Sequence, residues 1–383
     1  MSTTPIAILG GGPVGLTLSL LLARRGVASV VVESRALDEA KRDARLLALS
    51  RGTLDTLATV VSLPPAAMAP IRKVVVSSRG EFGRAVLDER ESGGRALGAT
   101  IRYGDLLVAL DAACAASAYV DVRRHCTVAA VRQGTDSVEV GLADGATLSA
   151  PLVVNAEGGA AGGRAAAARQ SALTGDVDVI GPPAGTAFER FTRDGPLALL
   201  PLSGPVAGTS RTMSLVWCMS TAAADRREQL SDATLLQELQ AELGLRNGRL
   251  LALRARGRYP LVEQAREEVR EHRVVHVGNA AQTLHPVAGQ GLNLGVRDCV
   301  VLADVVAAAT AEQQDLLAGL PHYDRRRQAD RLAIRALTRT VPGLFATGFA
   351  PAAAARSLGL TMLSIFPDLR AEFARFLMFG VRS

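Results

Sequence analysis

The chain has 383 residues, of which 48% are hydrophobic and 21% are charged, and its formal net charge is +6 at pH 7. A chain of this length can bury a large core and is expected to form two structural lobes. Its only lysines are Lys41 and Lys73. The arginines are spread along the chain, with no basic run interleaved with aromatic residues, so the sequence gives little support to a nucleic-acid role, and we expect none.

Neither the cysteines nor the histidines form a pattern typical of a metal site. The four cysteines lie far apart in the sequence, at Cys114, Cys126, Cys218 and Cys299. Four of the five histidines are equally scattered, at His125, His272, His276 and His322. We therefore expect free thiols in a reducing compartment and no bound metal.

The first 33 residues predict a strand, a glycine-rich turn, a helix and a second strand. The apolar run Ile6–Leu9 is typical of a buried strand, and Gly10-Gly11-Gly12-Pro13-Val14-Gly15 follows it. An apolar helix is expected through Leu22, and a second strand over Ser29–Val32 ends at Glu33. This order of elements is typical of a dinucleotide-binding fold.

Each part of this segment has a separate task in such a fold. Gly10 makes the tight turn, Gly12 lets the backbone approach a pyrophosphate, and Gly15 lets the helix pack closely on the strand. The helix N-terminus offers free N–H groups and a partial positive charge to the phosphates. Glu33 stands at the interval at which these folds place a carboxylate on the ribose hydroxyls.

Two other interpretations of this segment are open. It is also compatible with a plain glycine-rich turn in a doubly wound fold. The second interpretation is a membrane anchor, because residues 1–23 carry no charged side chain. Three successive glycines and Pro13 would weaken a spanning helix, however, and no basic residue precedes the stretch. We expect a folded N-terminus in a protein that is not secreted.

The remaining pattern alternates between strand-like and helix-like stretches. Residues 35–63 predict a polar loop and a helix that carries Arg45. Up to residue 155 we expect strands at 74–78, 120–123, 127–131 and 152–155, a helix at 105–116, and a hairpin at 137–149 that turns at Asp144-Gly145. A β-rich stretch follows, with strands at 186–192, 197–201, 212–219 and 256–261 and one helix at 232–243. The last expected elements are a strand at 274–277, a helix at 292–308 and a helical tail from 322. Arg325, Arg326 and Arg327 are expected on a solvated face of that tail.

The most specific stretch is residues 277–295, where a strand ends in Gly278-Asn279 and a helix begins near Gly291. Asn279 can hydrogen-bond a polyol hydroxyl, and the glycines let a flat ring lie against the backbone. The helix N-terminus would stabilise negative charge on such a ring.

With Arg45 in the segment 43–50, these motifs resemble those of the FAD-dependent aromatic hydroxylases related to p-hydroxybenzoate hydroxylase. Within that family the chain is most similar to the ubiquinone-biosynthesis branch, the 2-polyprenyl-6-methoxyphenol hydroxylases. The form Asn-Ala-Ala-Gln-Thr-Leu-His-Pro at 279–286 carries this resemblance, and further matches lie at 187–192, 195–201, 214–217 and 259–261. The similarity covers most of the chain.

The resemblance implies an α/β fold, with a Rossmann-like FAD-binding domain of the p-hydroxybenzoate hydroxylase type, an inserted β-sheet substrate domain and C-terminal helices. The expected FAD-binding domain is discontinuous, with residues 1–74, 99–174 and 265–320. The β-rich substrate domain is expected at 75–98 and 175–264, and the C-terminal helical region at 321–383.

The resemblance also implies the residues that hold the cofactor. Those implied for the ADP half of FAD are Gly10, Gly12, Gly15 and Glu33. Arg45 would lie near the flavin, Arg102 would contact the cofactor before a helix, and Asn279 would take the place of the usual aspartate that binds the ribityl and pyrophosphate groups. Those implied to line the isoalloxazine are Gly289, Gln290, Gly291, Leu292 and Asn293. Glu157 departs from the family, which has Ala-Asp-Gly at this place.

Some side chains keep two interpretations. His285 is either a catalytic acid or base or a loop residue whose hydrogen bonds are satisfied. Arg45 and Arg102, taken alone, are typical of surface arginines beside helices. Trp217 is expected in the core, and the apolar stretch 341–366 is expected to be core or a helix pair, because prolines and Arg356 interrupt it.

The function implied is that of an FAD monooxygenase that hydroxylates a polyprenylated phenol in ubiquinone biosynthesis. NAD(P)H would be a transient co-substrate, and O2 would react through a flavin hydroperoxide. The protein is expected in the cytoplasm, where a lipid substrate would bring it to the inner membrane or into a ubiquinone-biosynthesis complex. Two alternatives are a flavin-dependent lipid reductase and a non-catalytic FAD-binding subunit of that complex. The second is suggested by Glu157, which departs from the Ala-Asp-Gly of the family.

Overall fold

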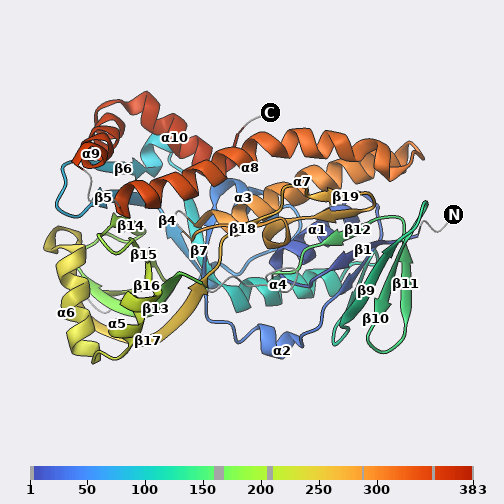
Figure 1. Ribbon diagram of the computed structural model, residues 1–383, viewed down its shortest axis with the longest axis horizontal. Coiled ribbons are helices and arrows are strands. Elements are labelled where there is room, and N and C mark those ends of the chain that lie inside the picture. Colours follow the sequence, from blue (N-terminus) through green and yellow to red (C-terminus); the bar gives the residue numbers. More distant parts are fainter. Residues whose placement is uncertain (1–3, 159–167, 205–209, 287–288, 347–349, 382–383) are drawn as a thin grey trace.

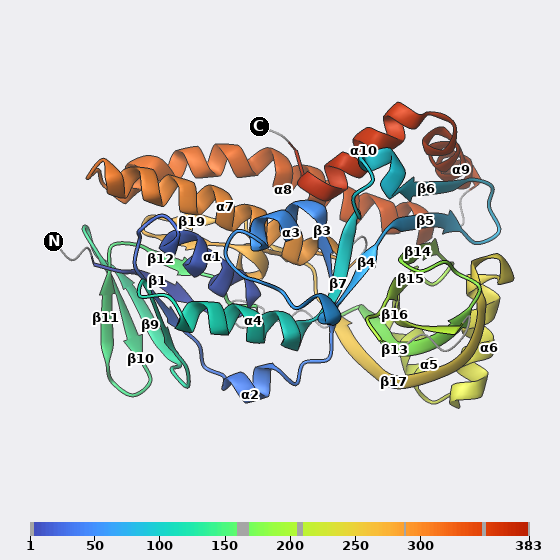
Figure 2. The same ribbon diagram turned by 180° about the vertical axis from the view of Figure 1, so that it is seen from behind.

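The computed structural model describes residues 4–158, 168–204, 210–286, 289–346 and 350–381. Two large sheets lie towards opposite ends of an elongated molecule, and two long helices run along one side of it (Figures 1 and 2). This arrangement confirms the α/β class that the sequence predicts. Within the described part of the chain, none of the helices combines the length and apolar character that a membrane span requires.

The first sheet has six strands in the order β19-β20-β12-β1-β2-β8. Their bounds are β1 Ile6–Leu9, β2 Ser29–Val32, β8 Val120–Arg123, β12 Val153–Asn155, β19 Arg270–Glu271 and β20 Val274–His276. All neighbouring strands are parallel except β19 and β20. Strands β1 and β2 are apolar runs because both faces of this sheet are covered: helices pack on one face, and a three-stranded antiparallel sheet that includes Val138 and Val140 packs on the other. The helices of this lobe are α1 Pro13–Ala23, α4 Tyr103–Ala115 and α7 Gln290–Ala311.

Strand register brings three distant loops to one edge of this sheet. Leu9 is paired with Asn155, and Asn155 with His276, so β1, β12 and β20 end side by side. The carboxyl edge of a parallel sheet is where ligands bind in such folds. The glycine turn after β1 and the Gly278-Asn279 loop after β20 therefore meet there, although more than 260 residues of chain separate them.

The second sheet has seven strands in the order β17-β13-β16-β15-β14-β5-β6. Their bounds are β5 Lys73–Ser78, β6 Arg84–Asp88, β13 Gln170–Ile180, β14 Thr186–Phe191, β15 Pro196–Pro201, β16 Ser210–Ser220 and β17 Arg249–Leu261. One face carries Phe188, Leu199 and Trp217, which are buried in a core that includes Leu235 and Leu239 of α6. Trp217 thus lies in the core, as predicted. Because side chains alternate along a strand, Glu189, Ala198 and Val216 point to the other face.

Smaller elements complete the fold. The sheet β3-β7-β4, which lies between the two large sheets, has bounds Leu46–Ser50, Gly98–Arg102 and Met68–Ile71. The hairpin sheet has β9 Val128–Gln133, β10 Val138–Leu142 and β11 Thr147–Ala150, and the short pair is β18 Gln264–Ala265 with β21 Gln282–Thr283. The other helices are α2 Leu37–Ala40, α3 Arg51–Leu57, α5 Thr221–Glu228, α6 Asp232–Leu243, α8 Leu316–Ala346, α9 Ala350–Ile365 and α10 Pro367–Phe379.

Two local predictions differ from the structure. Arg45 is not on a helix: it directly precedes β3, because Leu46–Ser50 pairs with β7 in an antiparallel ladder. Strand β13 was not expected at all, and it crosses the predicted domain boundary between residues 174 and 175. The exact domain limits stay predictions.

A buried charge cluster joins α7 to α8 and corrects a third prediction. Arg327 was expected on a solvated face, but it is only 4% exposed because α8 turns this side toward α7. Its Nε donates to Asp298 Oδ1 at 2.7 Å, and its Nη2 lies 2.8 Å from Asp330 Oδ2. Asp298 is fully buried, and its Oδ2 also accepts a hydrogen bond from the Gly278 backbone N–H at 3.3 Å. The cluster therefore supports one of the loops at the sheet edge.

We predict that Asp298→Asn lowers the free energy of unfolding by about 3 kcal/mol, because it leaves the charge of Arg327 partly uncompensated in the interior. Urea denaturation followed by circular dichroism measures this. The matched control is Asp121→Asn, which removes an exposed ion pair with Arg123 and should cost less than about 1 kcal/mol. Equal losses in the two variants would contradict this role of Asp298.

Candidate cofactor-binding site

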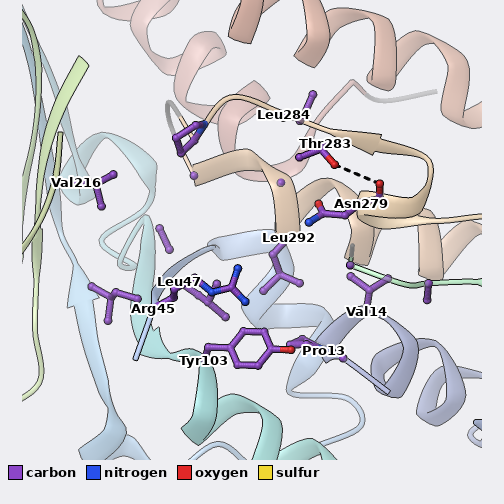
Figure 3. Close-up of a pocket in the computed structure, with 18 of the residues that line it drawn as sticks. Pro13, Val14, Arg45, Leu47, Tyr103, Val216, Asn279, Thr283, Leu284 and Leu292 are labelled. Carbon is purple, nitrogen blue, oxygen red and sulfur yellow. Dashed lines mark hydrogen bonds between the residues drawn. The ribbon is translucent and has the colours of Figure 1, made fainter. Parts of the chain in front are cut away.

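A cavity of about 950 Å³ opens between the two large sheets. The loops after β1, β12 and β20, the start of α7, strand β3 and one face of the seven-stranded sheet all contribute to its wall. Figure 3 shows Val216 on one side and Val14 and Asn279 on the other, with Arg45, Leu47 and Leu292 between them. The volume is near the upper end of the range of ligand sites, roughly 300–1,000 Å³.

The glycine turn has the geometry that a bound pyrophosphate requires. A methyl group at Gly15 would lie 2.0 Å from the carbonyl oxygen of Gly10, so only glycine allows α1 to pack this closely on β1. At Gly12, by contrast, a methyl group would meet only the Tyr103 hydroxyl, at 3.4 Å, and would point into the cavity. Gly15 thus serves the fold, whereas Gly12 leaves space for a ligand.

Glu33 lines the cavity beside this turn and is 6% exposed. Its Oε2 accepts a hydrogen bond from the Gly11 backbone N–H at 2.8 Å. Its Oε1 accepts one from the Arg35 backbone N–H at 2.9 Å and one from Arg35 Nε at 3.2 Å. The carboxylate is therefore held in place at the end of β2, where a ribose hydroxyl can reach it.

Two helices begin at this cavity. Neither Gly12, before α1, nor Gly289, before α7, has a side chain that caps the helix. Gly289 has a left-handed backbone, with φ of +58°, which suits glycine. The first N–H groups of a helix carry partial positive charge, so both ends favour an anionic or electron-rich group in the cavity.

Close packing around Val14 brings the two helix starts together. A methyl group at Gly278 would lie 3.1 Å from Val14 Cγ2, and one at Gly295 would lie 2.9 Å from it. The Cys299 thiol also approaches the Val14 carbonyl oxygen, at 3.4 Å. The loop after β20 and the first turns of α7 are therefore packed directly on the start of α1.

The loop after β20 presents Asn279 to the cavity, and the Asn279 carbonyl accepts a hydrogen bond from Thr283 Oγ1 at 3.4 Å (Figure 3). Gly289, Gly291 and Leu292 also line the cavity. The sequence thus grouped these residues as the structure does, and their contact with a flavin stays a prediction.

Gln290 and Asn293 face other partners. The Gln290 amide donates to the Leu377 carbonyl of α10 at 3.2 Å. The Asn293 side chain accepts from the Ser50 N–H at 2.8 Å and donates to the carbonyls of Ala48 and Gly289 at 2.9 and 2.7 Å. Asn293 therefore fixes β3 against the start of α7, and neither residue is part of the cavity wall.

Arg45 lines the cavity next to Tyr103, a residue that the sequence did not single out. The Arg45 guanidinium lies 5.0 Å from the centre of the Tyr103 ring and makes a bidentate ion pair with Asp43, whose closest contact is 2.5 Å. This pair raises the pKa of Arg45 and lowers that of Asp43. The sequence feature that could have identified Tyr103 is its position next to Arg102, just before a predicted helix.

Arg102 does not belong to the cavity wall. Its Nη1 donates to the Ala44 carbonyl at 2.8 Å, and its Nη2 contacts Asp176 Oδ2 of β13 at 2.9 Å. Arg102 therefore supports the segment that leads to Arg45 and links it to the seven-stranded sheet.

His285 lines the cavity and is 2% exposed. Burial lowers its pKa to about 4, so the imidazole is neutral near pH 7 and can donate or accept a hydrogen bond without carrying charge. Glu157 also lines the cavity, and its backbone N–H donates to Asn155 Oδ1 at 3.0 Å.

The wall that the seven-stranded sheet contributes is mostly apolar. Its residues are Val74, Ala187, Phe188, Glu189, Pro196, Ala198, Leu200, Val216 and Cys218. Glu189 is the one carboxylic acid among them, and burial alone raises its pKa to about 8. Sequence reasoning assigned no role to Glu189, which lies with Arg190 between Phe188 and Phe191 of a predicted strand.

Comparison with known proteins identifies relatives of the whole chain. Residues 3–336 match the family model described as FAD binding domain. The chain is 31% identical to ubiquinone hydroxylase UbiL of Rhodospirillum rubrum over 97% of its own length and 89% of the relative's. It is 30% identical to 3-demethoxyubiquinol 3-hydroxylase of Escherichia coli, over 93% and 94% of the two chains.

The fold is also that of a solved flavoenzyme structure. The crystal structure of PqsL from Pseudomonas aeruginosa, a probable FAD-dependent monooxygenase, superposes with a TM-score of 0.74 and 20% identity, and the match covers 94% of this chain and all of the other. These findings confirm the predicted fold type, the resemblance to ubiquinone-biosynthesis hydroxylases and FAD as the cofactor. The open side of Gly12, the fixed carboxylate of Glu33 and the two helix starts fit a dinucleotide of this kind.

We predict different outcomes for alanine at two neighbouring glycines. Gly15→Ala should lower the free energy of unfolding by at least about 2 kcal/mol, because the new methyl group overlaps the Gly10 carbonyl. Gly12→Ala should cost less than about 1 kcal/mol but weaken FAD binding roughly tenfold or more. Urea denaturation and FAD titration measure these effects. Wild-type FAD affinity in Gly12→Ala would show that no phosphate approaches this position.

We predict that His285 contributes to acid sensitivity. Its folded pKa of about 4 lies below its ordinary 6.5, so the unfolded chain takes up this proton first. The free energy of unfolding should fall as the pH drops from 6.5 to 4, by up to ~1.4 kcal/mol per pH unit. His285→Gln should show a shallower fall in thermal melts across this range, whereas the exposed His322→Gln should follow the wild type. Parallel curves for all three proteins would exclude the effect.

Proposed function

We propose that this chain, which belongs to the FAD binding domain family of flavin-dependent hydroxylases, hydroxylates a polyprenylated phenol in ubiquinone biosynthesis with NAD(P)H and O2. The observation that carries the proposal is the single cavity of about 950 Å³. It joins the predicted cofactor loops to the apolar face of the seven-stranded sheet. A cofactor at one end and an apolar ring at the other would therefore share the same cavity.

In this proposal the six-stranded lobe holds the cofactor. Gly12 and the start of α1 receive the pyrophosphate, and Glu33 holds the adenosine ribose. Asn279 binds a polyol hydroxyl, while Gly289, Gly291 and Leu292 face the ring system at the start of α7. When bound, FAD supplies the redox chemistry with NAD(P)H and the activation of O2 for transfer to an electron-rich ring.

The chain itself contributes to the reaction by binding and orienting the cofactor and the substrate and by shielding them from water. The start of α7 stabilises negative charge on a ring that lies against Gly289 and Gly291. The apolar wall, which includes Leu200 and Val216, excludes water from the reacting groups and contacts the prenyl chain. Arg45 and Tyr103 form the side wall between the two halves of the cavity.

We further propose that the protein takes its substrate from the cytoplasmic surface of a membrane. Helices α9 and α10 and the residue between them expose apolar side chains at neighbouring positions, namely Leu358, Met362, Ile365, Phe366 and Leu369. Leu358 and Ile365 are 62% and 63% exposed. Such a surface suits the apolar interior of a lipid layer.

The first experiment is reconstitution of the purified protein with FAD, followed by NAD(P)H oxidation with and without a geranyl-substituted 2-methoxyphenol. We expect a flavin spectrum, substrate-stimulated oxidation and a product that carries one oxygen atom from ¹⁸O2, detected by mass spectrometry. Turnover without incorporated oxygen would favour the lipid reductase. Bound FAD without any stimulated turnover would favour the non-catalytic subunit, and failure to bind FAD would exclude all three.

A further inference from the structure

One carboxyl group stands in the apolar wall of the cavity. Glu189 lies in the middle of β14, where it is paired with Val76 of β5 and Ala198 of β15. Ala198 is paired in turn with Val216, so these residues form a row across the sheet. Glu189, Ala198 and Val216 all line the cavity, and Phe188 and Leu197 beside them in sequence are packed in the core behind the sheet.

The carboxyl group of Glu189 has no hydrogen bond and no ion pair with any residue that the structure describes. Its titration is shifted by burial alone, to a pKa of about 8, without a contribution from any cation. Cys218 is itself buried, and its thiol pKa is raised by burial and by the neighbouring Glu189. Solvent reaches Glu189 only in part, and the cavity is the space that it lines.

A carboxyl group in such surroundings is costly, because apolar neighbours restrict its hydration and no described residue of the protein replaces the hydrogen bonds that it loses. A ligand in the cavity can supply the missing partner. The ligand class that fits is an apolar molecule with one hydroxyl group, since the wall around Glu189 is formed by Ala187, Ala198 and Val216. A phenol with an apolar tail has this character.

We propose that the carboxyl group of Glu189 hydrogen-bonds the ring hydroxyl of the phenol and so selects substrates with a free hydroxyl over their ethers. This inference rests on the proposed function. Glu189 also fixes the rotation of the ring, because its contact holds one edge while the apolar wall holds the faces. A hydroxyl group can donate to the carbonyl oxygen of a neutral carboxyl or to a carboxylate, so the contact persists in both protonation states.

The test uses a matched pair of probes on the FAD-loaded protein, namely a geranyl-substituted 2-methoxyphenol and its methyl ether. Their dissociation constants are measured from changes in flavin absorbance. The wild type should bind the phenol about tenfold more tightly than the ether, the effect of one buried hydrogen bond. Glu189→Leu should bind both alike, whereas Glu189→Gln should keep the preference because an amide oxygen accepts the same hydrogen bond. Glu139→Leu, which replaces an exposed acid on β10, is the control and should behave as the wild type.

The stability of the same variants separates this role from a structural one. Glu189→Leu should raise the melting temperature of the ligand-free protein, because an unpartnered carboxyl gives way to an apolar group. A lowered melting temperature with an unchanged preference for the phenol would overturn the proposal. So would a wild type that binds phenol and ether equally.

An infrared difference spectrum gives a second measurement that needs no stable leucine variant. Phenol binding to the wild type at pH 6 should shift a protonated-carboxyl C=O band that Glu189→Gln lacks, and the ether should leave the band unchanged. The same band change with the ether would contradict the proposal. If the wild type forms no hydroxylated product, the proposed function fails; if it forms product but Glu189→Leu keeps its preference, only this inference fails.

Discussion

The contact of Val14 with Gly278 and Gly295 is the constraint on which the candidate site depends. It places the start of α1, the loop after β20 and the first turns of α7 against one another, with no room for a further methyl group. Asp298 supports the same junction from behind, because its carboxylate binds both the Gly278 N–H and the buried Arg327. The two segments expected to hold a cofactor therefore form one closely packed wall.

The seven-stranded sheet completes the cavity by having two unlike faces. One face packs against α6 in the core that includes Trp217, and the other forms a mostly apolar cavity wall that carries Glu189. The sheet β3-β7-β4 joins the two lobes, where Thr100 Oγ1 donates to the Pro201 carbonyl at 2.5 Å and Arg102 contacts Asp176. The proposed arrangement, with the cofactor on the six-stranded lobe and the substrate ring on the seven-stranded sheet, follows from these contacts.

The sequence predicted best what is encoded locally. The glycine turn, Glu33 and the Asn279 loop follow strands that the sequence marks as clear apolar runs. Because the carboxyl ends of parallel strands lie at one edge of the sheet, these loops are expected to meet there. Arg45 was misplaced because β3 exists through pairing with β7, about fifty residues later. Arg327 was misplaced because its burial depends on α7. The contact of the Gln290 amide with α10 likewise depends on a distant helix and could not be predicted from the sequence. Tyr103 and Glu189 acquire their positions only when distant strands are assembled, so periodicity alone could not select them.

The pairing of Arg45 with Asp43 has a consequence for how a charged ligand would arrive. Of the residues that the structure places around the cavity, the arginines are Arg35 and Arg45, and each already contacts a carboxylate. Long-range attraction of a phosphate-bearing ligand is therefore weak here despite the chain's overall excess of positive charge. Capture of the dinucleotide would rest on short-range backbone contacts, and its association rate would vary little with ionic strength.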